Sequence, residues 1–146
     1  MKIFRLIPLL AVSVLVLATG CRLKDIRTVT LHAKGVRCPA CATAVIRSLA
    51  TTAELSPDQA VAVDEAAQTA TASWKDPARN NTAAVSKVVV HYGTGDIDVT
   101  YDSMKLAIKN LEFAVAAAGY DVQSLPYDIA ADPAARAALP EACRAH

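Results

Sequence analysis

No charge of one sign dominates this 146-residue sequence, which contains 15 Lys and Arg residues against 14 Asp and Glu residues. Removal of an N-terminal segment that carries Lys2 and Arg5 would leave 13 basic residues against the same 14 acidic ones. A chain with so little net charge lacks the positive field that attracts nucleic acid or anionic lipid headgroups. We therefore expect no nucleic-acid partner and no polybasic membrane patch.

A hydrophobic run long enough to cross a membrane is also absent. Residues 6–17 are apolar, but this run is shorter than the ~20 residues that a membrane-spanning helix needs. The run follows Lys2 and Arg5 and precedes three small residues, Ala18-Thr19-Gly20, an order typical of an export signal. Small residues directly before Cys21 resemble the lipobox of bacterial lipoproteins, in which the Cys is lipidated and begins the mature chain.

This resemblance implies a signal peptide at 1–20 and a tether at 21–26 that is held to the membrane by lipid on Cys21. Ordinary cleavage near Gly20 is the alternative, and it would also export the protein. Because Arg22 follows Cys21, the resemblance implies the periplasmic side of the outer membrane as the location.

The sequence also lacks a disulfide framework and the residue sets of an enzyme. With Cys21 assigned to lipid, only Cys38, Cys41 and Cys143 remain, and their spacings do not build a framework. There is no Ser/His/Asp set, no paired catalytic carboxylates and no phosphate-binding loop, so we predict a protein that is not an enzyme. Cys143 and His146 could add a metal ligand or an intermolecular disulfide, but we expect a spare thiol in a disordered tail.

The most informative stretch is residues 35–41, with the sequence GVRCPAC. Apolar and polar residues alternate over 28–34, which predicts a half-buried strand. After the stretch, Val45, Ile46 and Leu49 form one apolar helical face. Pro39 suits the first turn of that helix. Both thiols should therefore lie near the unpaired N–H groups at the helix N-terminus, which favours thiolate over thiol.

Two neighbouring thiolates can bind a soft metal ion or close into a disulfide. Soft thiolates select ions such as Cu(I) or Hg(II), whereas a structural zinc site normally has four ligands, so Zn(II) or Cd(II) is the second choice. Thiol–disulfide exchange by Cys38 and Cys41 is the functional alternative. The pair could also be a vestigial or purely structural disulfide, or it could be silent in a surface-anchored interaction domain whose insertion makes the contact. We expect the pair to lie outside the core, so that its replacement by Ser would preserve the fold.

The rest of the chain predicts an α+β fold. Residues 51–84 are ambiguous between an extra hairpin and a continued helix. Residues 85–101 alternate around a Gly-rich turn and predict a hairpin. Asp102 or Ser103 should cap a helix that ends at Gly119, and a short strand follows. The order strand, helix, two strands, helix, strand predicts a ferredoxin-like βαββαβ fold with one antiparallel sheet, two helices on one face and an insertion after the first helix. The buried stripe of the second helix should be Ile108, Leu111, Val115 and Ala118.

In this arrangement Gly35, Cys38 and Cys41, then Tyr101-Asp102 and Gly119-Tyr120, resemble the pattern of the heavy-metal-associated domain family. The family includes copper chaperones, modules of metal-transport ATPases and periplasmic mercury-binding proteins. The resemblance covers about 27–125, with an insertion at about 51–84 and a tail at 126–146. It implies a soft-metal-binding protein that uses Cys38 and Cys41 and passes the ion to an ATPase or another thiol-bearing metal protein, or sequesters it.

The resemblance also names three residues near the metal. Val36 replaces the usual Met as a buried loop anchor, and Tyr120 stands where the family has a residue facing the metal. Arg37 replaces a small polar residue, and as a cation it could keep a neighbouring thiol ionised. Packing alone is the other interpretation of Tyr120, and a solvated charge is the other interpretation of Arg37. His32 and His91 should lie on the solvent face of the sheet, and Trp74 should be a packing anchor.

Overall fold

The structure is a computed structural model that describes residues 24–75 and 83–144. The expected signal peptide, Cys21 and His146 lie outside the described residues. Six strands and four helices follow one another in the described part of the chain, in this order: β1 (Ile26–Lys34), α2 (Pro39–Thr52), β2 (Ala62–Asp64), β3 (Thr69–Ser73), β4 (Val85–His91), β5 (Asp96–Asp102), α3 (Ile108–Ala117), β6 (Asp121–Gln123), α4 (Pro133–Ala138) and α5 (Glu141–Arg144). None of the helices described is both long and apolar enough to cross a membrane.

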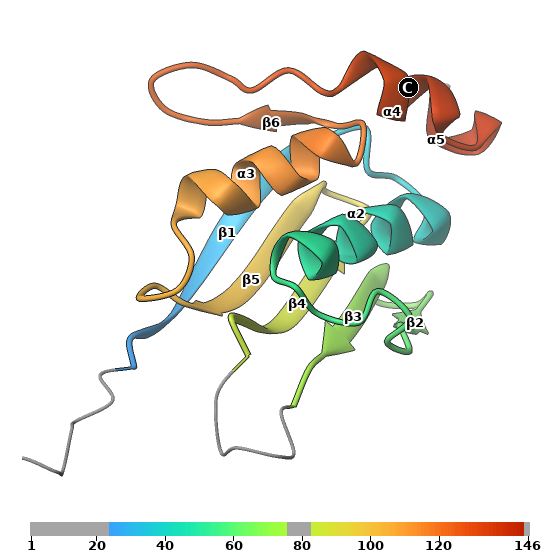
Figure 1. The fold of residues 1–146 in the computed structure, drawn as a ribbon. Helices are drawn as coiled ribbons and strands as arrows, with labels where there is room; N and C mark the ends of the chain where they lie inside the picture. The colour runs from blue at the N-terminus through green and yellow to red at the C-terminus, as the bar shows by residue number, and fades with distance from the viewer. Residues whose placement is uncertain (1–23, 76–82, 145–146) are drawn as a thin grey trace, which may run out of the picture.

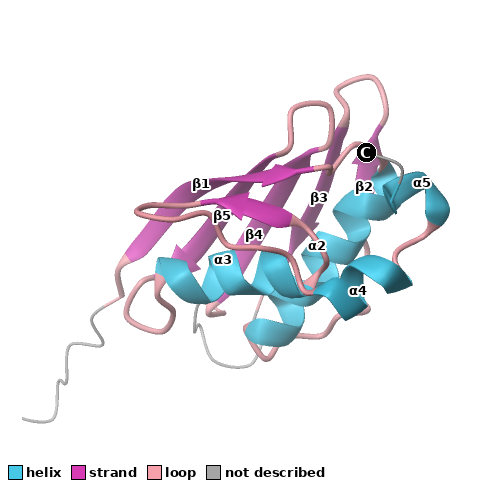
Figure 2. Cartoon of the chain, turned by 90° about the horizontal axis from the view of Figure 1, so that it is seen from above, coloured by secondary structure: helices cyan, strands magenta, loops and turns pink. Residues whose placement is uncertain are grey.

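The strands form one antiparallel sheet in the order β2-β3-β4-β5-β1-β6, and α2 and α3 lie side by side on one face of it (Figure 1). In the longest pairing, β1 runs against β5 with Val29 opposite Val99 and Leu31 opposite Ile97. The order β4-β5-β1-β6, with a helix after β1 and another after β5, is the predicted ferredoxin-like arrangement. Seen from above, the sheet and the helices form two layers (Figure 2).

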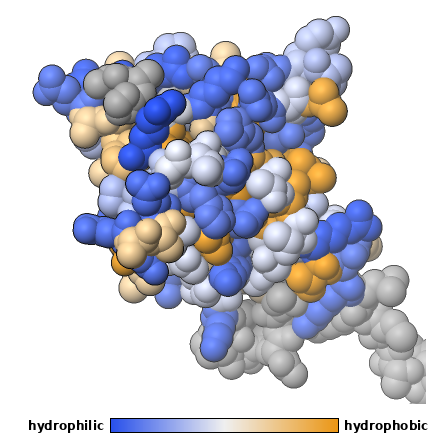
Figure 3. Space-filling model, turned by 180° about the vertical axis from the view of Figure 1, so that it is seen from behind, coloured by the Kyte–Doolittle hydropathy of each residue, from blue (hydrophilic) through white to orange (hydrophobic). Residues whose placement is uncertain are grey.

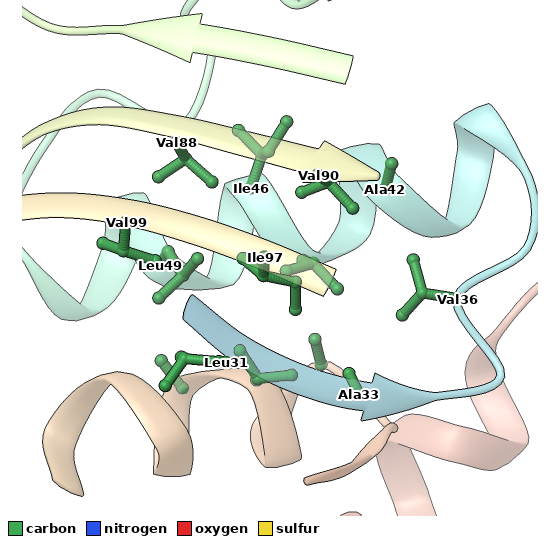
Figure 4. Packing of buried hydrophobic residues seen from close by; sticks show 14 of the residues in the cluster. Leu31, Ala33, Val36, Ala42, Ile46, Leu49, Val88, Val90, Ile97 and Val99 are labelled. Carbon is green, nitrogen blue, oxygen red and sulfur yellow. The ribbon is translucent and has the colours of Figure 1, made fainter. Parts of the chain in front are cut away.

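The core lies between these two layers because each strand points alternate side chains toward the helices. Figure 4 shows Val88, Val90, Ile97 and Val99 of the sheet facing Ile46 and Leu49 of α2, and each of these side chains is at most 1% exposed. Fully burying a side chain of this size stabilises a fold by roughly 1.5–3 kcal/mol. The Ser48 hydroxyl also donates to the Ala114 carbonyl at 2.6 Å, which joins α2 to α3.

The opposite face of the sheet carries mainly hydrophilic residues (Figure 3). There His32 pairs with Asp96 at 2.9 Å, and His91 pairs with Asp98 at 3.1 Å. Both imidazoles are partly exposed, as expected for histidines on the side of the sheet away from the helices.

The ambiguous segment forms the extra hairpin, β2–β3, and not a continued helix. β3 pairs with β4, with Ala70 opposite Val90 and Ala72 opposite Val88, so the hairpin extends the sheet beyond β4. Ala70 and Ala72 are buried, whereas the whole of β2 is exposed. Trp74 is a packing anchor as expected: it is buried, and its indole N–H donates to the Ser56 carbonyl at 3.1 Å.

Two details of the second helix differ from the prediction. The residue at its N-cap is Ala107, which makes no capping side-chain bond, because Asp102 is still in β5 and its carboxylate accepts from the Met104 N–H of the turn that follows. Ile108 is 43% exposed, so the buried stripe is Leu111, Ala114, Val115 and Ala118. Gly119 ends the helix with φ +98°, the left-handed conformation that was predicted there.

The expectation of a loosely attached tail is wrong for residues 126–144. A single antiparallel bridge between Val122 and Ile129 holds the returning chain against β6, and the Asp132 N–H donates to the Ala116 carbonyl at 2.9 Å. Leu139 and Cys143 are buried against the core. Both views place α5 beside the start of α2 (Figures 1 and 2). The tail therefore closes over the end of the molecule that carries residues 35–41.

Candidate metal centre

The two cysteines of the CxxC lie at the start of α2, where the sequence predicts them. Cys38 is the N-cap, with extended backbone angles of φ −146° and ψ 160°, and Pro39 is the first helical residue. The Cys41 backbone N–H donates to the Cys38 Sγ at 3.2 Å. Sulfur thus replaces the oxygen that usually caps a helix. A thiolate at this position is stabilised by that N–H and by the positive end of the helix dipole.

Cys38 and Cys41 are joined as a disulfide, with their Cα atoms 5.2 Å apart. Cys41 is fully buried and belongs to the hydrophobic core, and Cys38 is partly buried beside it. The expectation that the pair lies outside the core is therefore wrong for Cys41. Cys41 lies in the first turn of α2, on the side of the helix that faces the sheet. Its side chain is therefore buried, although the turn directly follows a loop.

Cys143 was expected to be a spare thiol in a disordered tail. It lies instead in α5, in a fixed and buried position. It is 4% exposed, and its sulfur lies 3.2 Å from the Cys38 Sγ, although 105 positions separate the two residues in the sequence. The sulfur atoms of Cys38, Cys41 and Cys143 all lie within 4.8 Å of one another. One ion placed among them could touch all three.

Contacts around α4 hold α5 in this position. Asp132 caps α4 by accepting from the backbone N–H groups of Ala134 and Ala135, at 2.8 and 3.1 Å. Arg136 forms an ion pair with Asp121 at 2.8 Å and donates to the Gly119 carbonyl at 3.3 Å. These bonds fasten α4 to the segment between α3 and β6, and α5 follows α4 after two residues.

The structure places the three residues named by the family resemblance in different ways. Val36 is 1% exposed and points into the core near Ala42 and Val90 (Figure 4), so it anchors the loop before the CxxC. Arg37 is exposed. Tyr120 is 2% exposed, and its hydroxyl makes no hydrogen bond with the described residues. Burial raises the pKa of Tyr120, and the nearby Cys143 thiol raises it further.

A cavity of about 440 Å³ opens beside Cys143. Tyr120 and Cys143 line it, and four cations and one carboxylate surround it, namely Lys34, Arg37, Arg136, Arg144 and Asp121. Arg136 is paired with Asp121, and Lys34 is paired with Asp128 at 3.3 Å. Arg37 and Arg144 supply further positive charge beside the Cys143 thiol.

The donor set fits a soft metal ion once the disulfide is reduced. Thiolate sulfur selects ions such as Cu(I) or Hg(II) over hard ions such as Mg²⁺ or Ca²⁺. Among the described residues, no His, Asp, Glu or further Cys side chain joins the three sulfurs as a fourth ligand. Structural zinc sites normally have four ligands, so this set suits zinc less well.

Sequence reasoning identified two of the three clustered sulfurs. The CxxC could be found because its two cysteines share one helical turn. The sequence indicated the third sulfur, that of Cys143, only as a Cys without an assigned role. It lies in a segment whose Ala- and Pro-rich composition suggested a disordered tail. Asp132 followed by Pro133 is the start signal of α4 and could have indicated an ordered tail.

Comparisons with known proteins give one similar fold. No protein-family model matches the sequence, and no curated protein does. A solved structure described as "CopZ metallochaperone" aligns with 66% of this chain and 100% of its own chain, at 23% sequence identity and a TM-score of 0.43. A likeness at this level assigns no activity to the chain.

Proposed function

We propose that this chain is an exported, soft-metal-binding protein of the copper or mercury type, which captures the ion through Cys38 and Cys41 and passes it on or sequesters it. One observation carries the proposal: the two sulfurs lie at the N-terminus of α2, within one turn and within reach of one ion. The role is binding and not catalysis. Copper(I) or Hg(II) is the expected cargo, and Zn(II) or Cd(II) is less suitable.

Capture begins from the reduced pair. A dithiol reductant would convert the Cys38–Cys41 disulfide into two thiols and become a disulfide itself, so two electrons and two protons move to the protein. Each thiol then releases its proton as its sulfur bonds to the ion. The N–H of Cys41 and the dipole of α2 stabilise the sulfur of Cys38 in its ionised form.

The lipobox resemblance of residues 18–21 supports export and an anchor on Cys21, with the outer membrane as the proposed location. A thiol-bearing partner, such as the metal-binding module of a transport ATPase, could take over the ion by ligand exchange. Its thiolate would bond to the ion before Cys38 or Cys41 is released.

Competition between a soft and a borderline ion tests this proposal. The full chain, purified in detergent and fully reduced without oxygen, would be mixed with equal amounts of Cu(I) and Zn(II) and then desalted. We expect Cu(I) to be retained and Zn(II) to be lost, because two or three thiolates suit Cu(I) but leave Zn(II) short of ligands. Retention of Zn(II) in preference to Cu(I), or of neither ion, would contradict the proposal.

Thiol–disulfide exchange is the second candidate, because Cys38 and Cys41 are bonded to each other in the structure. In that role, the reduced pair would transfer two electrons and two protons to a substrate disulfide and re-form its own bond. Failure of the reduced chain to convert a disulfide substrate into thiols would remove this candidate.

A further inference from the structure

Cys143 shares its surroundings with the CxxC and not with the surface. The residue is 4% exposed, its sulfur lies 3.2 Å from the Cys38 sulfur, and all three sulfurs fall within 4.8 Å of one another. Neither the CxxC motif nor the proposed two-thiolate capture assigns it a role. A thiol with a packing role alone could contact carbon atoms anywhere in the core. The Cys143 thiol instead contacts the sulfur of Cys38, which caps α2.

The position is built by a chain of specific contacts. Gly119, with φ +98°, turns the chain after α3 and leaves room for α4: a Cβ at Gly119 would lie 2.9 Å from the Arg136 backbone nitrogen. Arg136 pairs with Asp121, and Leu139 is buried between α4 and α5. These contacts hold α4 and α5 in place, and α5 in turn positions the Cys143 sulfur at the start of α2.

The surroundings of the three sulfurs also point to a ligand. The Tyr120 hydroxyl is buried, makes no hydrogen bond with the part of the chain that the structure describes, and lines the same cavity as Cys143. An unsatisfied buried hydroxyl costs roughly 1–3 kcal/mol, so a native structure rarely keeps one without a reason. Three thiolates around a monovalent or divalent cation leave the complex negative, and Arg37 and Arg144 line the adjoining cavity.

We propose that Cys143 is a third metal ligand, so that the reduced chain holds one soft ion between three thiolates of its own. This inference rests on the proposed function, which requires only Cys38 and Cys41. A third ligand changes how the site would release its ion. Cys143 would already occupy the third coordination position, which an incoming thiolate of a partner would otherwise take. Transfer of the ion would then require α5 to withdraw, and the third ligand favours retention over rapid hand-over.

The test uses the full chain, reduced and held in detergent without oxygen, with Hg(II) as the probe. X-ray absorption at the mercury edge counts the sulfur atoms bonded to the ion. We expect three in the wild-type chain and two in Cys143→Ser. Competition with a small dithiol gives the affinity, and we expect the Kd for Hg(II) to rise by about tenfold or more in Cys143→Ser, since loss of even an outer partner of a metal ligand costs 10–100-fold.

Ala142→Ser is the matched control, because it introduces the same side chain at the neighbouring, exposed position of α5. It should keep three sulfurs and the wild-type Kd. Two sulfurs around mercury in the wild-type chain would overturn the proposal, whatever Cys143→Ser does to folding. An equal Kd in Cys143→Ser and wild type would also overturn it. Both results leave the two-thiolate function standing, whereas a wild-type chain that retains no mercury would contradict the function itself.

Discussion

Cys38 combines two roles that different residues usually hold. As the N-cap of α2, it accepts the Cys41 N–H that would otherwise have no partner at the start of the helix. As part of the candidate metal centre, the same sulfur lies near Cys143. The group that starts the helix is thus also the group that the helix makes more nucleophilic.

Tyr120 has a buried hydroxyl that makes no hydrogen bond within residues 24–75 and 83–144, and its removal should not harm the fold. We expect Tyr120→Phe to leave the free energy of unfolding of the reduced, metal-free chain unchanged or to raise it by up to about 1 kcal/mol, because the unsatisfied hydroxyl is removed and the ring is kept. Tyr120→Ala, the control that also removes the ring, should cost about 3–5 kcal/mol. Urea unfolding measures both. A loss of more than 1 kcal/mol in Tyr120→Phe would show that the hydroxyl has a stabilising partner.

The structural position of a single residue could be predicted from the sequence where the residues that it contacts lie close to it in the sequence. Pro39, the two thiols of the CxxC and Gly119 were placed correctly because capping and helix ends depend on a few neighbouring residues. Cys143 could not be placed, because its contact with Cys38 spans 105 positions and depends on how α4 packs. The cap expected at Asp102 failed since β5 continues through that residue.

Among the elements, α4 packs directly against Gly119. We expect Gly119→Ala to lower the free energy of unfolding by about 1–3 kcal/mol, because φ is +98° and an added Cβ would lie 2.9–3.1 Å from the backbone of α4. Urea unfolding measures the loss. Alkylation of Cys143 in the reduced chain should also become faster, as α4 and α5 are pushed away.

Gly93→Ala is the matched control. An added Cβ there would meet the side chain of Gln68, which can rotate away, and Gly93 lacks a positive φ. We expect a change within about 0.5 kcal/mol and no change in Cys143 alkylation. Equal behaviour of the two variants would contradict the account of how α4 is held.

The attachment of the tail to β6 should weaken in acid. The Ala131 N–H, and next the Arg136 guanidinium, hold the pKa of Asp121 below its ordinary value of 3.8. The stabilisation is therefore complete above pH 3.8 and is lost as the pH falls through the lower pKa of the folded chain. The side chain of Asp121 is 39% exposed, so we expect less than about 1 kcal/mol. Urea unfolding from neutral to acid pH should show a shallower loss in Asp121→Asn, and an identical acid profile would contradict this assignment.

At the scale of the whole molecule, the sheet and its two helices could be predicted from the sequence. Apolar and polar residues alternate along the strands, and each of the two helices has one apolar face. The hairpin β2–β3 was ambiguous since its alanines suit either structure, and pairing of Ala70 and Ala72 with β4 decides between them. The start of α4 has a local signal in Asp132 and Pro133, but the packing of the tail depends on contacts with Ala116, Gly119 and Asp121, which lie outside the tail.

These contacts bring the first and the last of the described helices to one site. The CxxC comes from the first helix described and Cys143 from the last, and α3 and β6 supply the surface on which the last helices rest. If metal is bound there, it joins distant segments and should stabilise the whole domain, by RT ln(1 + [L]/Kd) for an ion that binds only the folded state.

The most direct measurement is the number of Cu(I) ions per chain after anaerobic loading and desalting of the reduced, full-length protein. We predict about one ion per chain in the wild type and in Ala40→Ser, which changes only an exposed residue between the two thiols. We predict essentially none in Cys38→Ser/Cys41→Ser, with folding checked by circular dichroism because Cys41 is buried. Equal retention in a folded double variant, or no retention in the wild type, would contradict the conclusion that these two thiols bind a soft metal ion.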